Sequence, residues 1–254
     1  MQHFFVEPSA IDVDAGRVVI GGQDYNHIKN VLRMRIGEVV SVSNGENDND
    51  YRCEIKEYTD SEVILTLMFI KEDALELPAK VYLFQGLPKA DKMELIIQKA
   101  VELGVYEIIP VATRRAVVKL DEKKASSKVN RWQAISEAAA KQSKRGLVPK
   151  VSMPMSFKDA VKMAGELEVV AIPYELCEGM QDTAKWLEAC CSAGSIGVFI
   201  GPEGGFDEEE IALAKSAGIM PISLGRRILR TETAGMTTLS ILMYRLEING
   251  HRIE

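Results

Sequence analysis

Two glycine-bearing loops in the C-terminal quarter of the chain constrain its fold more than any other feature. A short apolar run ends at Ile200 and is followed by residues 201–206, GPEGGF; a second ends at Leu224 and is followed by residues 225–235, GRRILRTETAG. Each loop then leads into a helical pattern. Open α/β sheets bind ligands at the carboxyl ends of neighbouring strands, so these two units predict one pocket built from both loops.

The residues of the first loop narrow what such a pocket could hold. A glycine-rich loop before a helix often cradles phosphate, because the helix N-terminus is partly positive. Here the loop carries Glu203, and the helix opens on four acids at 207–210, which would repel a phosphate. The pattern is neither a P-loop nor GxGxxG. It favours a neutral or cationic nucleoside; glycines that only form a tight turn before a capped surface helix are an equal alternative.

The first 72 residues predict a small β domain. β-branched and aromatic residues gather at 4–6, 18–20, 39–43, 51–57 and 63–69, with turn residues between them. One helix is expected at 24–34, with Asp24 as its N-cap. We therefore expect a small β-barrel with one helix. A charged connector, residues 71–78, places the domain boundary between 1–72 and 73–254.

After the connector, strand and helix patterns alternate. Strands are expected at 81–84, 106–111, 168–172, 196–200 and 220–224; helices are expected at 91–103, 128–144, 157–164, 181–190, 207–217 and 233–248. Alternation of this kind predicts a mostly parallel sheet with helices on both faces. The predicted fold class is therefore α/β.

Other features bound the class of protein. The chain has 254 residues, of which 46% are hydrophobic and 27% charged, as in soluble globular proteins. No stretch approaches the ~20 apolar residues of a membrane helix, and the N-terminus does not resemble a signal peptide. The four cysteines have no CxxC spacing and the three histidines are scattered. We expect reduced structural cysteines, no metal site and a cytoplasmic location.

Taken together, the two loops are far more specific than either alone. GPEGGF followed by LGRRILRTETA resembles the SPOUT superfamily of RNA methyltransferases and, within it, the bacterial 16S ribosomal RNA uridine-N3 methyltransferases (ribosomal RNA small subunit methyltransferase E). The resemblance extends over nearly the whole chain: residues 27–33, 85–104 and 131–149 match other family segments. One departure is His3, where the family usually has arginine.

The resemblance implies a fold, a cofactor and a site. It implies a PUA-like RNA-binding domain over 1–72 and a SPOUT methyltransferase domain with a C-terminal trefoil knot over 73–254. The implied cofactor is S-adenosylmethionine, whose positive sulfonium suits an acid-bearing loop. A third loop would follow the strand that ends near Pro173, although simple strand termination explains that proline equally well. The implied cofactor-binding residues are Ile172, Pro173, Tyr174, Ile200, Gly201, Pro202, Glu203, Gly204, Gly205, Leu224, Gly225, Ile228, Leu229, Arg230, Thr233 and Ala234.

The implied reaction is methyl transfer to N3 of a uridine in 16S ribosomal RNA of the small ribosomal subunit. The N3 proton must leave, so a base or stabilisation of the developing anion is required. We expect Arg230 to stabilise the anion, because its guanidinium can donate to carbonyl oxygens; a salt bridge to Glu232 or Glu203 is the alternative. Glu232 is the nearest acid and the candidate base, with water as its alternative.

The distribution of charge bears on the RNA partner. The net charge of −6 argues against nucleic acid, but residues 113–150 hold 11 Lys or Arg and only three acids. A local basic patch is the footprint of phosphate binding, although on charge alone a solvated helix face is favoured. The loop motif shifts the preference to RNA. Candidate phosphate contacts are Arg33, Arg35, Arg114, Arg115, Lys141 and Arg145.

The final helix, expected at 233–248, has apolar residues over a wide surface, including Leu239, Leu242 and Met243. That coverage is wide for an edge helix packed on one sheet face. The resemblance implies a homodimer paired through this helix, with a substrate site built from both protomers. Burial within its own monomer is the alternative.

Two other functions remain as alternatives at this point. One is a SPOUT enzyme that acts on a ribose 2′-oxygen or on another base. The second is a non-catalytic RNA-binding assembly factor that keeps the fold. The glycines in both loops argue against a decayed site.

Overall fold

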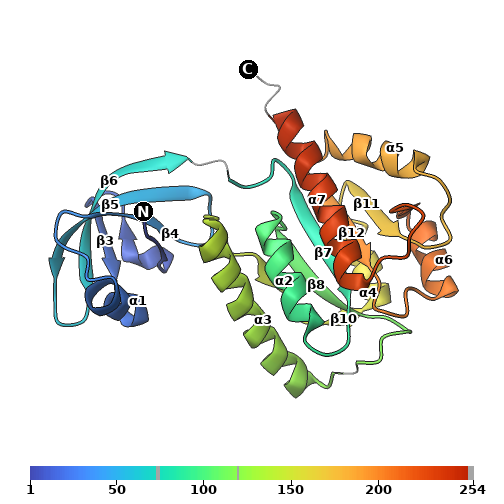
Figure 1. Cartoon of the computed structure of the whole chain (residues 1–254), viewed down its shortest axis with the longest axis horizontal. Helices are drawn as coiled ribbons and strands as arrows, with labels where there is room; N and C mark the ends of the chain where they lie inside the picture. The colour runs from blue at the N-terminus through green and yellow to red at the C-terminus, as the bar shows by residue number, and fades with distance from the viewer. Residues whose placement is uncertain (73–74, 119, 251–254) are drawn as a thin grey trace. The chain divides into compact units, whose positions relative to one another are not determined.

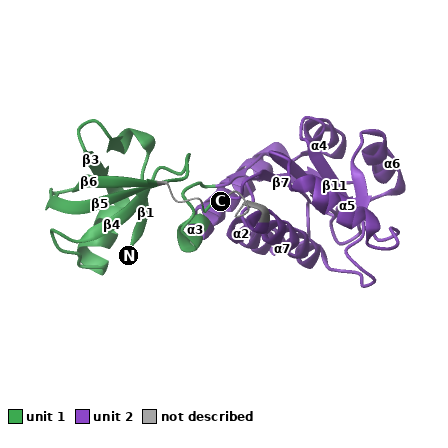
Figure 2. Cartoon of the chain, turned by 90° about the horizontal axis from the view of Figure 1, so that it is seen from above, with its two compact units in different colours: residues 1–76, 140–148 green, residues 77–139, 149–254 purple. Residues whose placement is uncertain are grey.

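The chain forms two compact units, each with its own sheet (Figures 1 and 2). The computed structural model describes residues 1–72, 75–118 and 120–250. Unit 1 comprises residues 1–76 and 140–148, and unit 2 comprises residues 77–139 and 149–254. Part of the predicted connector, residues 73–74, lies outside the described residues. The domain boundary between residues 72 and 73 stays a prediction.

Unit 1 is built on a six-stranded sheet in the order β1-β4-β5-β6-β3-β2. β1 runs parallel to β4, and the other neighbours are antiparallel. The alternating apolar residues point inward, so that Val18, Ile20, Val40 and Val42 are buried. The strands are β1 (His3–Phe5), β2 (Ile11–Asp12), β3 (Arg17–Ile20), β4 (Val39–Ser43), β5 (Asn49–Tyr58) and β6 (Val63–Glu72).

The helix predicted at 24–34 is present, but its first residue, its N-cap and its helix type differ from the prediction. Helix α1 (Gly22–Asn26) begins after Gly21 and continues as a π-helical turn over His27–Val31. Gly22 has a φ of 62°, a left-handed conformation that glycine adopts readily, so the chain enters the helix earlier. The prediction of Asp24 as the cap is wrong. Its carboxylate instead accepts a hydrogen bond from Lys141 Nζ at 3.0 Å.

Unit 2 is built on a parallel sheet with the order β10-β8-β7-β12-β11-β13, in which β9 also pairs with β8. The predicted α/β class and the mostly parallel sheet are confirmed. The trefoil knot stays a prediction. The strands are β7 (Lys80–Gly86), β8 (Glu107–Ala112), β9 (Lys150–Val151), β10 (Met155–Ser156), β11 (Val169–Pro173), β12 (Ser195–Ile200) and β13 (Met220–Ile222).

Helices cover both faces of this sheet, with α2 and α7 on one side and α4 and α6 on the other (Figure 2). Between the sheet and the second pair, Phe84 and Phe199 stack with ring centroids 4.4 Å apart. The helices are α2 (Lys92–Glu102), α3 (Glu122–Ser143), α4 (Phe157–Ala164), α5 (Gln181–Cys190), α6 (Glu208–Ser216) and α7 (Thr231–Gly250). Helix α3 belongs to unit 2 as far as Ala139 and to unit 1 beyond it.

The remaining differences from the sequence prediction lie in short or terminal segments. Strands β2, β9 and β10 were not predicted, because two residues cannot display a period of two. Helix α3 begins at Glu122 instead of residue 128, and α7 begins at Thr231 instead of residue 233. The ends of helices and strands depend on tertiary contacts, which the helix and strand propensities of the residues do not reveal.

The cysteines are free thiols in the structure. Cys53 and Cys190 are buried, and burial raises the pKa of each thiol to about 12. Neither therefore forms appreciable thiolate at neutral pH. Among the described residues, no helix has both the length and the apolar character needed to cross a membrane.

Two glycines beside the ends of β7 and β12 should respond in opposite ways to the same change. A Cβ on Gly86 would lie 2.6 Å from Pro202 Cδ and 2.7 Å from Pro202 N, whereas one on Gly235 in α7 would meet nothing closer than 3.8 Å. We predict that Gly86→Ala lowers the free energy of unfolding by about 1–3 kcal/mol. Gly235→Ala should raise it by about 0.5–1 kcal/mol, because alanine favours the helix. Urea denaturation measures the free energy of unfolding of both variants. Equal changes in the two variants would contradict the close approach of Gly86 to Pro202.

Candidate active site

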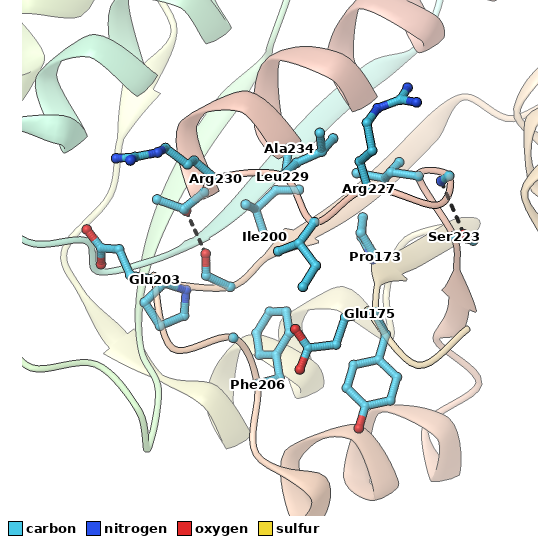
Figure 3. Close-up of a pocket in the computed structure, with 18 of the residues that line it drawn as sticks. Pro173, Glu175, Ile200, Glu203, Phe206, Ser223, Arg227, Leu229, Arg230 and Ala234 are labelled. Carbon is cyan, nitrogen blue, oxygen red and sulfur yellow. Dashed lines mark hydrogen bonds between the residues drawn. The ribbon is translucent and has the colours of Figure 1, made fainter. Parts of the chain in front are cut away.

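The loops that follow three adjacent strands enclose one cavity of about 450 Å³ (Figure 3). The strands are β12, β11 and β13, in which β11 pairs with both of the others. Because all three strands are parallel, their carboxyl ends lie at the same edge of the sheet. The pocket expected from the two glycine-bearing loops is therefore present, and the loop after Pro173 forms a third wall.

The first wall is the compact loop of residues 201–206. Gly205 has a φ of 65°, and its N–H donates to the carbonyl of Pro202 at 2.9 Å. A Cβ on Gly201 would lie 3.2 Å from the backbone of Gly205, so a side chain at position 201 would force the loop to open slightly. The pocket thus has a wall made largely of backbone, as close approach to a ligand requires.

The acids that follow this loop have structural partners. The Asp207 side chain accepts from the N–H of Glu209, and the Glu210 side chain accepts from the N–H of Asp207, which together form a capping box for α6. Glu210 also accepts from the N–H of Arg114 at 2.9 Å. Arg114 and Arg115 both lie within ion-pair distance of Asp207. These contacts fix the loop to the end of β8.

Buried hydrogen bonds join the first wall to helix α7. The Thr231 hydroxyl donates to the carbonyl of Gly201 at 2.6 Å and accepts from Gln85 Nε2 at 2.9 Å. Gln85 is fully buried and also donates to the carbonyl of Gly86 at 2.9 Å. Three segments that are far apart in the sequence are thereby held together, namely the end of β7, the loop after β12 and the start of α7.

The second glycine-bearing loop, which follows β13, is anchored in a similar way. Thr183 of α5 donates its hydroxyl proton to the carbonyl of Ser223 at 2.7 Å and accepts from the N–H of Ser223 at 3.1 Å. Gly225 has a φ of 104°, and its N–H donates to Ser223 Oγ at 3.2 Å. The loop of residues 225–230 therefore begins and ends at fixed points and is exposed between them.

One lysine holds the two carboxylates at the edge of the cavity. Lys92 Nζ lies 2.9 Å from Glu203 Oε1 and 3.6 Å from Glu232 Oε2. Burial tends to raise the pKa of Glu203, but the hydrogen bonds from Lys92 and from the N–H of Lys89 outweigh it, so the pKa of Glu203 is lowered. The hydrogen bond to Glu203 in turn raises the pKa of Lys92. Lysine and glutamate are therefore both charged at neutral pH.

Arg230 is placed differently from these carboxylates. Its side chain is exposed, and within the described residues it makes no hydrogen bond or ion pair. The alternative prediction was a salt bridge from Arg230 to Glu232 or Glu203. In the structure both carboxylates pair with Lys92 instead. In Figure 3 the Arg230 and Glu203 side chains point to the same side of the pocket.

Most of the residues expected to bind the cofactor line the cavity. They are Pro173, Tyr174, Ile200, Gly201, Pro202, Glu203, Gly205, Leu224, Gly225, Ile228, Leu229, Arg230 and Ala234. Four of the expected site residues, Ile172, Gly204, Thr233 and Glu232, are not among the lining residues. Ile172 is fully buried in the hydrophobic core, and a Cβ on Gly204 would face Arg115 at 3.1 Å. The roles of all these residues stay predictions.

Lys92, Glu175 and Phe206 line the cavity but are not among the residues that the sequence predicts to bind the cofactor. Figure 3 places the Glu175 carboxylate over the cavity, beside Phe206. The loop motif that contains Phe206 was a usable signal. Lys92 lies within the family-like segment 85–104, but its place in the first turn of α2, more than 100 residues before the first glycine-bearing loop, gave no local sign that it reaches the cavity.

The candidate RNA contacts differ in their availability. Arg33 and Arg35 are exposed. Lys141 pairs with Asp24 at 3.0 Å, and Arg145, only 3% exposed, pairs with Glu76. Of the other cations in the basic stretch, Lys124, Arg131 and Lys150 also lie beside carboxylates, and Lys119 is outside the described residues. Much of the basic stretch is therefore neutralised by acids from elsewhere in the chain.

No group of histidine, cysteine or acidic side chains suited to a metal ion occurs in residues 1–72, 75–118 and 120–250.

Comparison with known proteins follows the same division of the chain. A model of an RNA methyltransferase domain matches residues 75–243, and one of an RNA methyltransferase PUA domain matches residues 20–68. Ribosomal RNA small subunit methyltransferase E of Bacillus subtilis is 34% identical over 98% of this chain and 98% of its own length.

Two similar solved structures carry a ligand. The ribosomal RNA small subunit methyltransferase E of Neisseria gonorrhoeae, bound to S-adenosylmethionine, is 27% identical with a TM-score of 0.81, covering 96% of this chain and 97% of that one. A protein of Legionella pneumophila, solved with the same bound cofactor, is 30% identical with a TM-score of 0.80, covering 95% and 96%. The matched PUA and methyltransferase domains and the near-complete coverage place this chain in the ribosomal RNA small subunit methyltransferase E family.

Proposed function

We propose that this chain methylates N3 of a uridine in 16S ribosomal RNA, with S-adenosylmethionine as its methyl donor. The observation that carries the proposal is the cavity enclosed by the three loops at the ends of β12, β11 and β13, in a chain whose relatives are methyltransferases of the small-subunit RNA. The cytoplasmic location expected from the sequence is part of the same proposal.

The residues around the cavity suit this cofactor. A volume of about 450 Å³ falls in the usual range of small-molecule pockets, roughly 300–1,000 Å³. The glycine-rich wall offers backbone groups, Ile200, Leu229 and Ala234 offer apolar contact, and Glu175 offers a carboxylate to a positive centre. The backbone groups of Leu224, Ile228 and Leu229 would hold the adenine. When bound, S-adenosylmethionine supplies an electrophilic methyl group on a sulfonium.

Arg230 and Glu232 are the catalytic residues of the proposal. Arg230 lines the cavity and has no side-chain partner in the described part of the chain. Its guanidinium is thus available to donate to a uracil carbonyl oxygen as negative charge develops. Glu232 Oε2 lies 3.6 Å from Lys92 Nζ, and the Glu232 carboxylate would accept the proton that leaves N3. Lys92 thereby orients both carboxylates next to Arg230.

The proposal extends to a homodimer formed through α7. Leu239, Leu242 and Leu246 of this helix are buried in their own chain, as the monomer alternative expects. The helix nevertheless leaves Tyr244 and Ile248 66% and 38% exposed, and residues four apart share one helical face. That apolar face supports pairing with a second copy. The substrate site would then include residues of both protomers.

The glycines of the first loop should differ in their effect on cofactor binding. A methyl group at position 205 would point toward Glu175 in the cavity and would also strain a φ of 65°, whereas one at position 204 would face Arg115. We predict that Gly205→Ala weakens S-adenosylmethionine binding roughly tenfold or more, about 1.4 kcal/mol. Gly204→Ala, the matched control, should bind far more nearly like the wild type. Calorimetry on the folded variants measures both S-adenosylmethionine affinities. A weaker affinity in Gly204→Ala than in Gly205→Ala would contradict the assignment of Gly205 to the cavity wall.

Removal of the Arg230 guanidinium should separate catalysis from binding. We predict that Arg230→Ala loses about 10²–10³ in single-turnover methyl transfer, the typical cost of removing one oriented donor. Cofactor affinity should change much less, because the loop is held by Thr231 and Ser223 instead. The rate is measured by the transfer of labelled methyl groups to 16S ribosomal RNA, and the cofactor affinity is measured by calorimetry. Wild-type turnover in the variant would remove Arg230 from the mechanism.

The dimer should dissociate when charge is placed on the exposed face of α7. We predict that Tyr244→Glu and Ile248→Glu shift the chain from dimer to monomer in sedimentation at micromolar concentration, because burying an unpaired charge is costly. Leu213→Glu on α6 is the matched control, since Leu213 is also 38% exposed. Met243 is a poorer site for this test, because it is partly buried in its own chain. A monomeric wild type that methylates RNA would contradict the shared site.

A further inference from the structure

The loop of residues 225–230 presents its arginines without partners. Arg226, Arg227 and Arg230 are exposed, and within the described residues their side chains form no hydrogen bond or ion pair. The loop is nevertheless anchored, by Thr183 at Ser223 and by Gly201 at Thr231. Fixed ends and free side chains are a suitable arrangement for contact with another molecule.

Three other arginines of unit 2 are paired with carboxylates. Arg114 pairs with Asp207 and Glu209, Arg115 pairs with Asp207, and Arg131 pairs with Glu94. A nearby carboxylate cancels most of the field of a cation at the distance of a ligand. The field of Arg226 and Arg227 is not cancelled in this way, although the chain as a whole has a net charge of −6.

These arginines also stand at the cavity. Four cations and only two carboxylates line it, and one of those carboxylates, Glu203, is already paired with Lys92. In Figure 3 the side chain of Arg227 extends away from the interior of the pocket. An uncompensated positive rim beside a cleft attracts anionic partners and raises their local concentration.

We propose that Arg226 and Arg227 bind backbone phosphates of the RNA strand that carries the target nucleotide. This inference rests on the proposed function and names the contact that holds the substrate at the cavity. Phosphate contacts of this kind set the register of a nucleic acid without reading its sequence. Arg226 and Arg227 would orient the strand, while Arg230, on the same loop, meets the reacting base. Ile228, 87% exposed between them, offers an apolar surface to a neighbouring base or ribose.

The test uses the full-length protein and a fluorescein-labelled single-stranded uridine 20-mer. Binding is followed by anisotropy between 50 and 200 mM KCl, and the slope of log K against log salt is compared. Arg226→Ala/Arg227→Ala should reduce the magnitude of that slope by about 1.4, since each phosphate contact on a single strand contributes ~0.7. Arg226→Lys/Arg227→Lys keeps the charges and should keep the slope.

A matched control removes the same net charge elsewhere on unit 2. Lys158 and Lys162 of α4 are exposed and do not line the cavity. Lys158→Ala/Lys162→Ala should leave the slope at its wild-type value. An equal reduction in both double variants would mean that total charge alone is responsible, and an unchanged slope in Arg226→Ala/Arg227→Ala would likewise overturn the proposal.

Calorimetry with S-adenosylmethionine completes the design. The arginine double variant should keep wild-type cofactor affinity. A loss of that affinity with an unchanged salt slope would assign the arginines to the carboxylate of the cofactor, and would overturn the RNA contact. Failure of the wild type to bind the cofactor or to methylate 16S ribosomal RNA would instead refute the proposed function, whatever the slope.

Discussion

The hydroxyl of Thr231 is the interaction on which the arrangement of the cavity depends. It donates to Gly201 and accepts from Gln85, so one buried side chain fixes the loop after β12, the end of β7 and the first turn of α7. A buried donor or acceptor that loses its partner costs about 1–3 kcal/mol, which makes any other loop position unfavourable. Gly86 also lies so close to Pro202 that an added Cβ would be 2.7 Å from the Pro202 nitrogen, so the end of β7 and this loop are closely packed.

Charges around the cavity fall into two groups with different physical roles. Asp207, Glu210 and Arg114 hold the start of α6 against the end of β8. Lys92 is similarly occupied with Glu203 and Glu232. Exposed pairs of this kind add little stability, about 0–1 kcal/mol each, but they fix positions and cancel fields. The arginines of residues 225–230 have no such partners in the described chain, so at the cavity their charge is available to a ligand.

Much of the fold followed from local patterns. The strand at 39–43 and the helices at 157–164 and 181–190 have the predicted bounds, because alternation and helical periodicity are strong there. The prediction failed where non-local contacts decide. Helix α1 starts at Gly22 because the two glycines at 21 and 22 form the turn that precedes it. Asp24 accepts a hydrogen bond from Lys141 and does not cap the helix. The two-residue strands exist only through their partners.

By itself, the sequence determined the α/β class, the family and the loops that meet at the cavity, since glycine spacing and apolar periodicity are local properties. Only the tertiary structure decided which charges are free. The cations of residues 113–150 look like a basic patch in sequence, yet Asp24, Glu76, Glu94, Glu107 and Asp207 reach them from distant positions. The same holds for Lys92, which reaches Glu203 from the start of helix α2. Coulombic attraction depends on separation in space, and that separation is set by the fold and not by the order of residues.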